Sequence, residues 1–192
     1  MTNAPFHEED YRDIQAVNQI KAARSRPFAR IEMPFLLRYL NHYSRDHART
    51  PMQWDDGPNA GFTTGKPWLM LNPNYPQINA AEQEGREDSV LNFYRQALRT
   101  RNEWIDLIRD GSFVPVDPKN RNVMAYARRL GERTLLILCS LSPKKSAVHL
   151  PAEYLTGNCK LLLGNMEQAP KLREKTLLQP CQCAVLLLEE TR

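Results

Sequence analysis

The sequence predicts an α+β protein, in which a helical, loop-rich part of residues 1–110 is followed by an antiparallel β-sandwich of residues 111–192. The first observation is that apolar residues before Gly111 recur at helical spacing or lie in proline-rich polar loops. The second is that apolar residues after Gly111 form short runs between turn residues. The 192 residues suit one or two domains, and the 42% hydrophobic share is ordinary for a globular chain.

Three helices are predicted in the first part, because apolar residues there recur every three or four positions. The expected ranges are residues 11–26, 34–45 and 88–104. The faces expected for the first two helices are Ile14, Val17, Ile20 and Lys21, and Phe35, Leu36, Tyr39 and Leu40. The third helix has Asp88 or Ser89 as its N-cap and an apolar stripe that includes Val90, Tyr94 and Leu98.

A long irregular stretch, roughly residues 45–80, separates the second helix from the third and contains Trp54, Phe62, Trp68 and Tyr75. A loop of that length inside a compact domain is uncommon and is usually functional. Three helices and a loop, with no predicted strands, leave apolar faces without a covering surface. We therefore expect the first part to pack on the β module or on a large partner.

Seven short strands are predicted after Gly111, each bounded by turn residues. Their runs are residues 112–117, 122–130, 133–141, 146–151, 159–165, 175–180 and 183–190. Seven short strands within about eighty residues are typical of an antiparallel sandwich. The aromatic residues of this part are Phe113, Tyr126 and Tyr154, too few for the row of exposed rings that a carbohydrate-binding module presents.

Composition argues against several function classes. The net charge is only +4, with 26 basic and 22 acidic residues, and the basic residues alternate with acidic or apolar ones instead of forming a stripe. Nucleic-acid binding is therefore not expected. No apolar run approaches the roughly 20 residues of a membrane span, and the polar, acidic first residues are not typical of a signal peptide.

Four cysteines, Cys139, Cys159, Cys181 and Cys183, lie in or beside apolar strand-like runs. Apart from a bare C-x-C they lack the spacing of a metal site. The sequence therefore predicts reduced, mostly buried thiols in a cytoplasmic protein, with no metal and no cofactor.

The most distinctive segment is SRDHARTPMQWDD, residues 44–56, which is followed at short intervals by NAGF, PW and NPNY. In these motifs the chain resembles the C-terminal third of the α-glucosidases of glycoside hydrolase family thirteen, in the branch of oligo-1,6-glucosidases and trehalose-6-phosphate hydrolases. The matching segments are residues 1–3, 11–14, 44–56, 59–79 and 89–102, and the run 178–190 resembles the closing strands of that branch.

The resemblance implies a catalytic (β/α)₈ barrel, with its active site at the C-terminal ends of the strands, followed by an antiparallel β domain. On this comparison the chain begins just after the eighth barrel strand, at Met1, which corresponds to an internal methionine. It contains the excursion after that strand, the last barrel helix at about Asp88–Trp104, and the β domain that covers this helix.

The same resemblance implies that the chain contains no catalytic residues. A retaining glycosidase needs two carboxyl groups about 5–5.5 Å apart, one as nucleophile and one as acid/base. The family holds these groups and a third carboxylate on barrel strands four, five and seven, which this sequence lacks. Asp46, Asp55 and Asp56 match no catalytic position, so the chain alone is expected to be inactive.

Two substrate-binding residues are implied by the resemblance. Arg45 matches the arginine that reaches the subsite of the non-reducing glucose, where a planar fork of N–H donors suits sugar hydroxyls. Gln15 stands where glutamate is usual, near the site of the departing sugar. The alternative for Arg45 is a salt bridge to Asp46 or Asp13 that pins the loop. 

The remaining loop residues are interpreted as structural. Arg49, Asp46, Trp54 and Trp68 are expected to anchor the loop to the barrel rim. His47 stands where asparagine is usual and is interpreted as a hydrogen-bonded loop histidine.

The sequence thus predicts a fragment of an exo-acting α-glucosidase that hydrolyses short α-glucosides, such as isomalto- or malto-oligosaccharides or trehalose-6-phosphate, by a retaining mechanism. Its expected partner is an α-glucoside oligosaccharide, bound only together with the missing barrel. The alternative is a non-catalytic remnant or a stand-alone β-sandwich interaction module.

Overall fold

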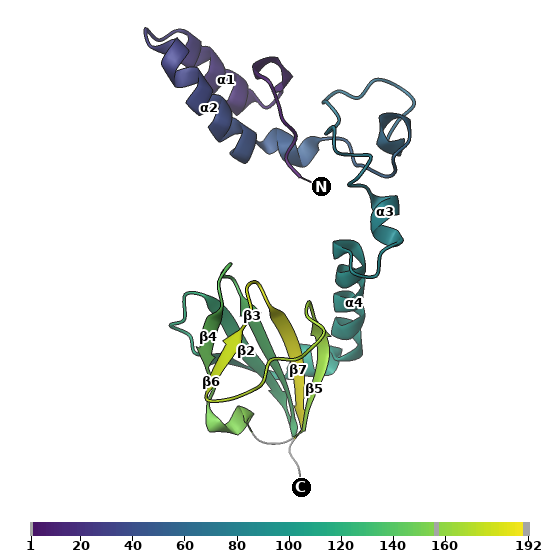
Figure 1. Cartoon of the computed structure of the whole chain (residues 1–192), viewed down its shortest axis with the longest axis vertical. Coiled ribbons are helices and arrows are strands. Elements are labelled where there is room, and N and C mark those ends of the chain that lie inside the picture. Colours follow the sequence, from purple (N-terminus) through teal and green to yellow (C-terminus); the bar gives the residue numbers. More distant parts are fainter. Residues whose placement is uncertain (1, 156–157, 190–192) are drawn as a thin grey trace. The chain divides into compact units, whose positions relative to one another are not determined.

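The computed structural model describes residues 2–155 and 158–189, and it divides into two compact units, Met1–Asn92 and Phe93–Arg192 (Figure 1). Met1 and Glu190, which belong to the motifs quoted above, lie outside the described residues. The units meet within a helix, and the predicted domain boundary between residues 110 and 111 stays a prediction.

The first unit contains two helices that lie side by side, α1 (Ile14–Arg24) and α2 (Ala29–Tyr43) (Figure 1). A single 3₁₀ turn, Glu8–Asp10, precedes them. Ala16, Ile20 and Ala23 are the buried residues of α1. The face predicted for this helix is wrong at Ile14, which is 66% exposed. The buried face of α1 is therefore built from Ile20 and two small alanines, and Ile14 lies outside it.

The start predicted for α2 is also wrong, because the helix begins at Ala29 and contains Pro34. Proline has no N–H, so the carbonyl of Arg30 loses its intrahelical donor, but the helix continues through this position. The predicted apolar face divides in two. Leu36 and Leu40 pack into the core of the first unit, whereas Phe35 and Tyr39 are exposed.

Amide side chains hold the long stretch between α2 and α3 (Ala80–Glu84) in place. Its regular structure consists of two 3₁₀ turns, Arg45–Arg49 and Pro58–Gly61. Gln53, fully buried, donates through Nε2 to the Ile78 carbonyl at 2.8 Å and to Asn74 Oδ1 at 3.0 Å. The predicted irregular stretch is therefore an ordered one, because buried amides replace the missing backbone ladder.

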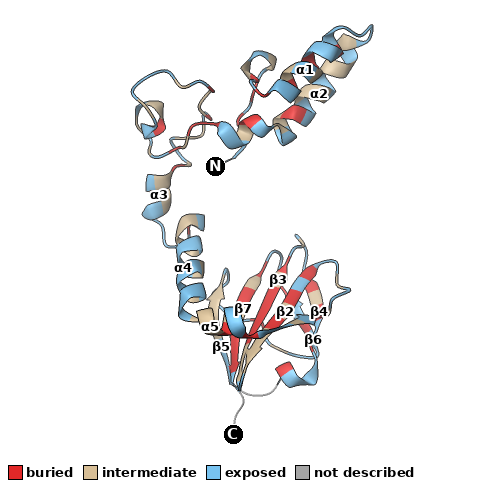
Figure 2. Cartoon of the chain, turned by 180° about the vertical axis from the view of Figure 1, so that it is seen from behind, coloured by how far each residue is buried: buried red, intermediate tan, exposed pale blue. Residues whose placement is uncertain are grey.

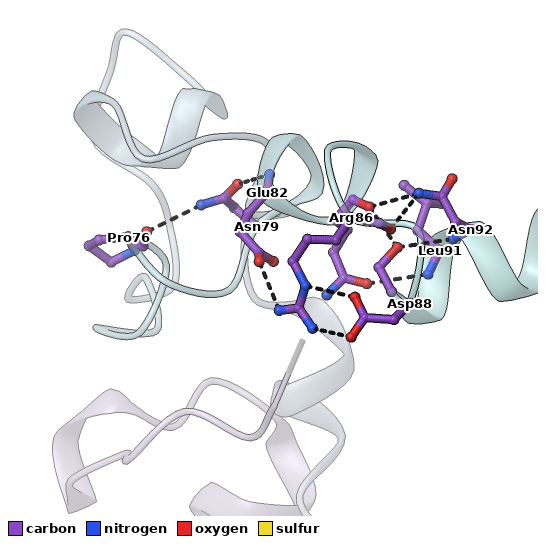
Figure 3. Close-up of polar contacts among 9 residues, drawn as sticks. Pro76, Asn79, Glu82, Arg86, Asp88, Leu91 and Asn92 are labelled. Atoms are coloured by element: carbon purple, nitrogen blue, oxygen red, sulfur yellow. Dashed lines mark hydrogen bonds and ion pairs between the residues drawn. The ribbon is translucent and has the colours of Figure 1, made fainter. Parts of the chain in front are cut away.

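Helix α4 (Val90–Glu103) is capped by Ser89, one of the two residues predicted for that role. Ser89 Oγ accepts from the Asn92 amide at 3.2 Å and donates to the Gln83 carbonyl at 2.6 Å. The Asn92 side chain donates to the carbonyls of Gln83 and Arg86 at 3.1 and 2.7 Å. Asp88 instead pairs with Arg86 at 3.1 Å (Figure 3). The first turn of α4 is thus fixed by its own side chains.

The apolar stripe predicted for α4 is present and uncovered. Val90, Tyr94 and Leu98 are 75%, 65% and 50% exposed, and none of the residues described in this helix is buried (Figure 2). An amphipathic helix with its apolar side in water is typical of a surface that packs against something else.

The second unit contains all seven predicted strands, and every pairing is antiparallel. Their bounds are β1 Ser112–Val116, β2 Val123–Leu130, β3 Arg133–Ser140, β4 Ser146–His149, β5 Asn158–Gly164, β6 Lys175–Leu178 and β7 Cys183–Glu189. The large sheet has the order β1-β2-β3-β7-β5, and β4 and β6 form a second, two-stranded sheet. The prediction of an antiparallel β domain is therefore confirmed.

The large sheet is covered on both faces. Leu136, Leu138 and Leu186 belong to the main core, which Val148 of β4 and Leu178 of β6 complete. On the opposite face the short helix α5 (Ile105–Asp110) places its buried Leu107 against a second cluster, which contains Leu135, Ile137 and Leu187. Alternation along β3 therefore divides its side chains between two layers.

The cysteine prediction is only partly right. All four are free thiols, but Cys139 and Cys183 are half-buried and Cys159 and Cys181 are exposed, so the expected burial is wrong. In the parts of the chain that the structure describes, no helix combines the length and hydropathy that crossing a bilayer requires.

Candidate sugar-binding recess

Both residues predicted to bind substrate lie at one small recess of the first unit, between α1, α2 and the loop that follows α2. Its volume is about 50 Å³, and its lining residues are Asp13, Gln15, Ala16, Gln19, Tyr39, Leu40, Tyr43, Ser44 and Arg45. The structure thus brings together Gln15 and Arg45, two residues that are far apart in sequence.

Asp13 is the charged centre of the recess. It is the N-cap of α1, where one oxygen accepts from the Gln15 amide at 3.1 Å, and the whole residue is only 4% exposed. Arg45 Nη2 lies 3.1 Å from Oδ1 and 3.0 Å from Oδ2, and Arg49 Nη1 lies 2.8 Å from Oδ2. Burial by itself raises the pKa of Asp13, but the hydrogen bonds from Arg45, Arg49 and the Gln15 amide together hold this pKa below its ordinary value.

Arg45 keeps most of its donors for solvent. Its side chain is 59% exposed, and the single nitrogen Nη2 makes both contacts with Asp13. Of the two salt bridges considered for this arginine, the structure shows the one to Asp13. A guanidinium carries five N–H groups. Because the contacts of Arg45 with residues 2–155 and 158–189 all involve Nη2, its Nε and Nη1 groups have no acceptor there. The contact with Asp13 fixes the orientation of the fork and leaves donors available at the recess.

Asp46, in contrast, is sealed inside the unit. It is fully buried, and its Oδ2 accepts from the backbone amides of Arg12 and Asp13 at 2.9 Å each. Its Oδ1 lies 3.8 Å from Arg49 Nη1. This carboxylate joins the start of α1 to the loop after α2, and it presents no atom to a substrate. The structural interpretation of Asp46 and Arg49 fits these contacts.

Sequence reasoning missed three residues that line the recess, Gln19, Tyr39 and Tyr43. Gln19 Oε1 is buried and has no hydrogen-bond partner among the described residues. The rings of Tyr39 and Tyr43 lie 5.0 Å apart and are 53% and 66% exposed. A signal existed, because positions four apart share one face of a helix: Gln19 follows Gln15 at that spacing, and Tyr43 follows Tyr39.

His47, Trp54 and Trp68 are not part of the recess. His47 Nε2 lies 3.2 Å from the Leu40 carbonyl, and its ring stacks on Phe6 with centroids 4.9 Å apart, which suits a loop histidine. The two tryptophans are 53% and 61% exposed. Their anchoring to a barrel rim stays a prediction.

The recess can bind a polar group, but its residues do not provide hydrolytic chemistry. A volume of about 50 Å³ is close to that of one or two waters at about 30 Å³ each, and far below the roughly 300–1,000 Å³ of a complete ligand pocket. Asp13 is the single carboxylate that lines it, whereas glycoside hydrolysis takes two. Among the residues that the structure describes, no group of three or more His, Cys, Asp or Glu side chains is placed to hold a metal ion.

Acid is expected to loosen α1 through Asp13. Because the pKa of Asp13 is lowered in the folded chain, the unfolded chain takes up a proton first, at its ordinary pKa of about 3.9. The stabilisation by this carboxylate is therefore complete above that pH and is lost as the pH falls through the lowered folded-state pKa. Hydrogen-exchange protection of the Val17 amide, which donates to the Asp13 carbonyl, should fall as the pH is lowered from about 4 through the folded-state pKa of Asp13.

Two variants separate this effect from general acid unfolding. Asp13→Asn cannot titrate, so protection of Val17 should start lower and change less over this pH range. Asp88→Asn removes an exposed carboxylate whose pKa is also lowered, by Arg86, and the fall at Val17 should persist. A fall that is the same in the Asp13→Asn variant would show that other groups control α1.

Family models match nearly the whole chain. The model described as the catalytic domain of alpha amylase matches residues 1–111, and the model of the C-terminal domain of maltogenic amylase matches residues 113–181. The chain is 38% identical over 193 residues to probable oligo-1,6-glucosidase 2 of Bacillus subtilis (strain 168); the match covers 100% of this chain and 34% of that relative.

Solved structures resemble this chain over nearly its whole length. Trehalose-6-phosphate hydrolase of Bacillus licheniformis has a TM-score of 0.86 and 30% identity, over 99% of this chain and 34% of that one. Trehalulose synthase from Pseudomonas mesoacidophila MX-45 has a TM-score of 0.81 and 35% identity, over 98% of this chain and 34% of that one. The chain spans about a third of the length of the proteins that it matches. It belongs to the α-amylase catalytic-domain family, glycoside hydrolase family thirteen, and carries a C-terminal domain of the maltogenic amylase type.

Proposed function

We propose that this chain forms one wall of the sugar site of an exo-acting α-glucosidase, which hydrolyses short α-glucosides by a retaining mechanism. The observation that carries the proposal is the recess itself, where Arg45 is oriented by Asp13 and keeps N–H donors available beside Gln15. Sugar hydroxyls are acceptors for such a fork, and the fork stays charged at any physiological pH.

Each side chain of the recess has a distinct role in this proposal. Arg45 donates to hydroxyls of the terminal glucose. Gln15, exposed on the first turn of α1, offers both a donor and an acceptor to the departing sugar. The neighbouring rings of Tyr39 and Tyr43 provide an apolar surface for the C–H face of a pyranose, as aromatic walls do in many ligand sites. Gln15 carries no charge, so it suits a neutral leaving sugar as well as a phosphorylated one.

The chemical step is assigned to residues beyond this chain. The recess has one carboxylate, and both oxygens of that carboxylate already bind arginine. We infer that the two carboxyl groups of a retaining mechanism belong to the part of the relatives that this chain does not span. The uncovered apolar stripe of α4 supports the same inference, because it needs a partner surface.

The substrates proposed are isomalto- or malto-oligosaccharides or trehalose-6-phosphate. Support comes from the relatives, one of which is named an oligo-1,6-glucosidase and another a trehalose-6-phosphate hydrolase. We also propose a cytoplasmic location, supported by four cysteines that are free thiols. Neither nucleic acid nor a membrane is proposed as a partner.

A chimeric enzyme tests the proposal. This chain replaces the matching third of the Bacillus subtilis relative, and glucose release from p-nitrophenyl α-glucoside is measured for the chimera, the parent and the isolated chain. We expect turnover by the chimera and none above blank by the isolated chain. Turnover by the pure isolated chain would show that the active site is misplaced here. If the chimera is folded but inactive while the parent enzyme is active, the non-catalytic alternative is favoured.

A further inference from the structure

Two half-buried cysteines lie opposite each other on neighbouring strands, at one end of the β3–β7 ladder. Cys139 of β3 and Cys183, the first residue of β7, are partners in the antiparallel register. Residues directly opposite one another in a sheet project their side chains to the same face. Cys139 follows Leu135 and Ile137 at alternate positions, so both thiols lie on the face that also carries α5.

Backbone hydrogen bonds identify the kind of pair. The Ser140 amide donates to the Gln182 carbonyl at 2.8 Å, so the neighbouring position is a hydrogen-bonded one. The Cys183 amide donates to Asn165 Oδ1 at 2.8 Å, and the Cys183 carbonyl accepts from the Asn165 amide at 3.4 Å. Both backbone groups of Cys183 therefore turn away from β3. Because the two kinds of pair alternate, Cys139 and Cys183 form a non-hydrogen-bonded pair.

This type of pair is the closer of the two. Its Cα atoms are typically about 4.5 Å apart, against about 5.5 Å in a hydrogen-bonded pair. A disulfide spans Cα separations of about 4.4–6.8 Å, with most between about 5.5 and 6 Å. Cys139 and Cys183 therefore lie at the short end of the range that allows a bond, without any change of register.

The environment suits a slow, reversible reaction. Burial, and secondarily the neighbouring Cys183, raises the pKa of the Cys139 thiol, so little of it is thiolate at neutral pH. Both thiols remain half-accessible. A disulfide formed at the short end of the allowed separation is strained, and strained disulfides are more easily reduced than relaxed ones.

We propose that Cys139 and Cys183 are a modification site that closes to a cross-strand disulfide by exchange with a small-molecule disulfide such as oxidised glutathione. One thiolate attacks a sulfur of oxidised glutathione, and a mixed disulfide and one glutathione thiolate result. The second cysteine then attacks the protein sulfur of the mixed disulfide and releases the second glutathione thiolate, which takes up a proton. The protein dithiol is oxidised by two electrons, and one oxidised glutathione becomes two glutathiones.

The chain offers its own controls, because Cys159 and Cys181 are exposed and neither lies opposite another cysteine in the register. Cys181 lies only two positions before Cys183, but its thiol is 3.6 Å from the Ser142 carbonyl, and its φ of 52° turns the backbone. Each test variant retains two cysteines. Cys159→Ser with Cys181→Ser retains the proposed pair, and Cys159→Ser with Cys183→Ser retains Cys139 and Cys181.

The experiment incubates the full 192-residue chain and both variants with oxidised glutathione and measures intact mass and free thiols in denaturant. The variant with the proposed pair should lose two hydrogen atoms, carry no glutathione and have no free thiol, and dithiothreitol should restore both thiols. The variant with Cys139 and Cys181 should instead carry glutathione. Far-UV circular dichroism confirms that both are folded.

Three results would overturn the proposal. The first is that the folded variant with Cys139 and Cys183 remains reduced. The second is that this variant retains stable glutathione adducts. The third is that the variant with Cys139 and Cys181 closes to an internal disulfide just as readily. The first two would show that the cross-strand geometry does not allow the bond. The third would show that the strand register does not decide which thiols react.

Discussion

Replacing Arg45 by alanine in the chimeric enzyme is expected to lower kcat/KM for p-nitrophenyl α-glucoside by more than tenfold, which is about 1.4 kcal/mol or more of transition-state stabilisation. The reason is that the guanidinium donors that face the recess would no longer bind the terminal glucose. The free energy of unfolding should change little, since the side chain is 59% exposed and its partner Asp13 keeps Arg49. Steady-state kinetics and thermal unfolding of the same preparation measure the two effects.

Arg49→Ala is the matched control for this experiment. Arg49 makes the shorter contact with Asp13, at 2.8 Å, but it does not line the recess. If Arg45 binds sugar, Arg45→Ala should reduce kcat/KM far more than Arg49→Ala. Equal losses, accompanied by equal destabilisation, would return Arg45 to the role of pinning the loop.

The largest effect on stability is expected from Leu138→Ala in β3. Leu138 is fully buried in the main core, between Ala125 of β2 and Ala184 of β7, which are its partners in the register. Neighbours as small as alanine cannot extend into the space left behind, so the free energy of unfolding should fall by about 2–5 kcal/mol. Urea unfolding of the full chain, followed by far-UV circular dichroism, measures the loss.

Leu141→Ala provides the comparison, because it removes the same atoms three positions later. Leu141 is 69% exposed, and a surface change of this kind is usually within about 0.5 kcal/mol. A loss at Leu138 no larger than that at Leu141 would mean that this region is not the core of the β unit.

The β unit was the part of the fold most predictable from sequence. Its strands combine local alternation with turn residues, as in the hairpin of β2 and β3, where Gly131 takes a φ of 59° that favours glycine. Both signals are local, so they survive without knowledge of tertiary contacts. The helical unit was harder. Helix α2 continues through Pro34, which normally ends or begins a helix, and α1 buries small alanines instead of Ile14.

The candidate site was predictable in part. Arg45 and Gln15 came from a resemblance in sequence, and the structure places both at one recess. Sequence reasoning left open whether Arg45 pairs with Asp46 or Asp13, because Asp46 is its neighbour in the chain whereas Asp13 comes close only through the fold. The contacts decide between them: Asp46 Oδ2 accepts from two backbone amides, whereas both oxygens of Asp13 lie within 3.1 Å of Arg45 Nη2. Tyr39 and Tyr43 were missed because they look like ordinary members of an apolar helix face.

The sealing of Asp46 has a consequence for how such a site changes over evolutionary time. The carboxylate that joins the start of α1 to the loop makes no contact with Arg45 or with the side chain of Gln15. Substitutions at positions 15 and 45 should therefore lower the free energy of unfolding only slightly. This matters because the free energy of unfolding of most natural proteins is small. On the proposed function, these two positions can therefore change sugar preference while Asp46 keeps the start of α1 joined to the loop.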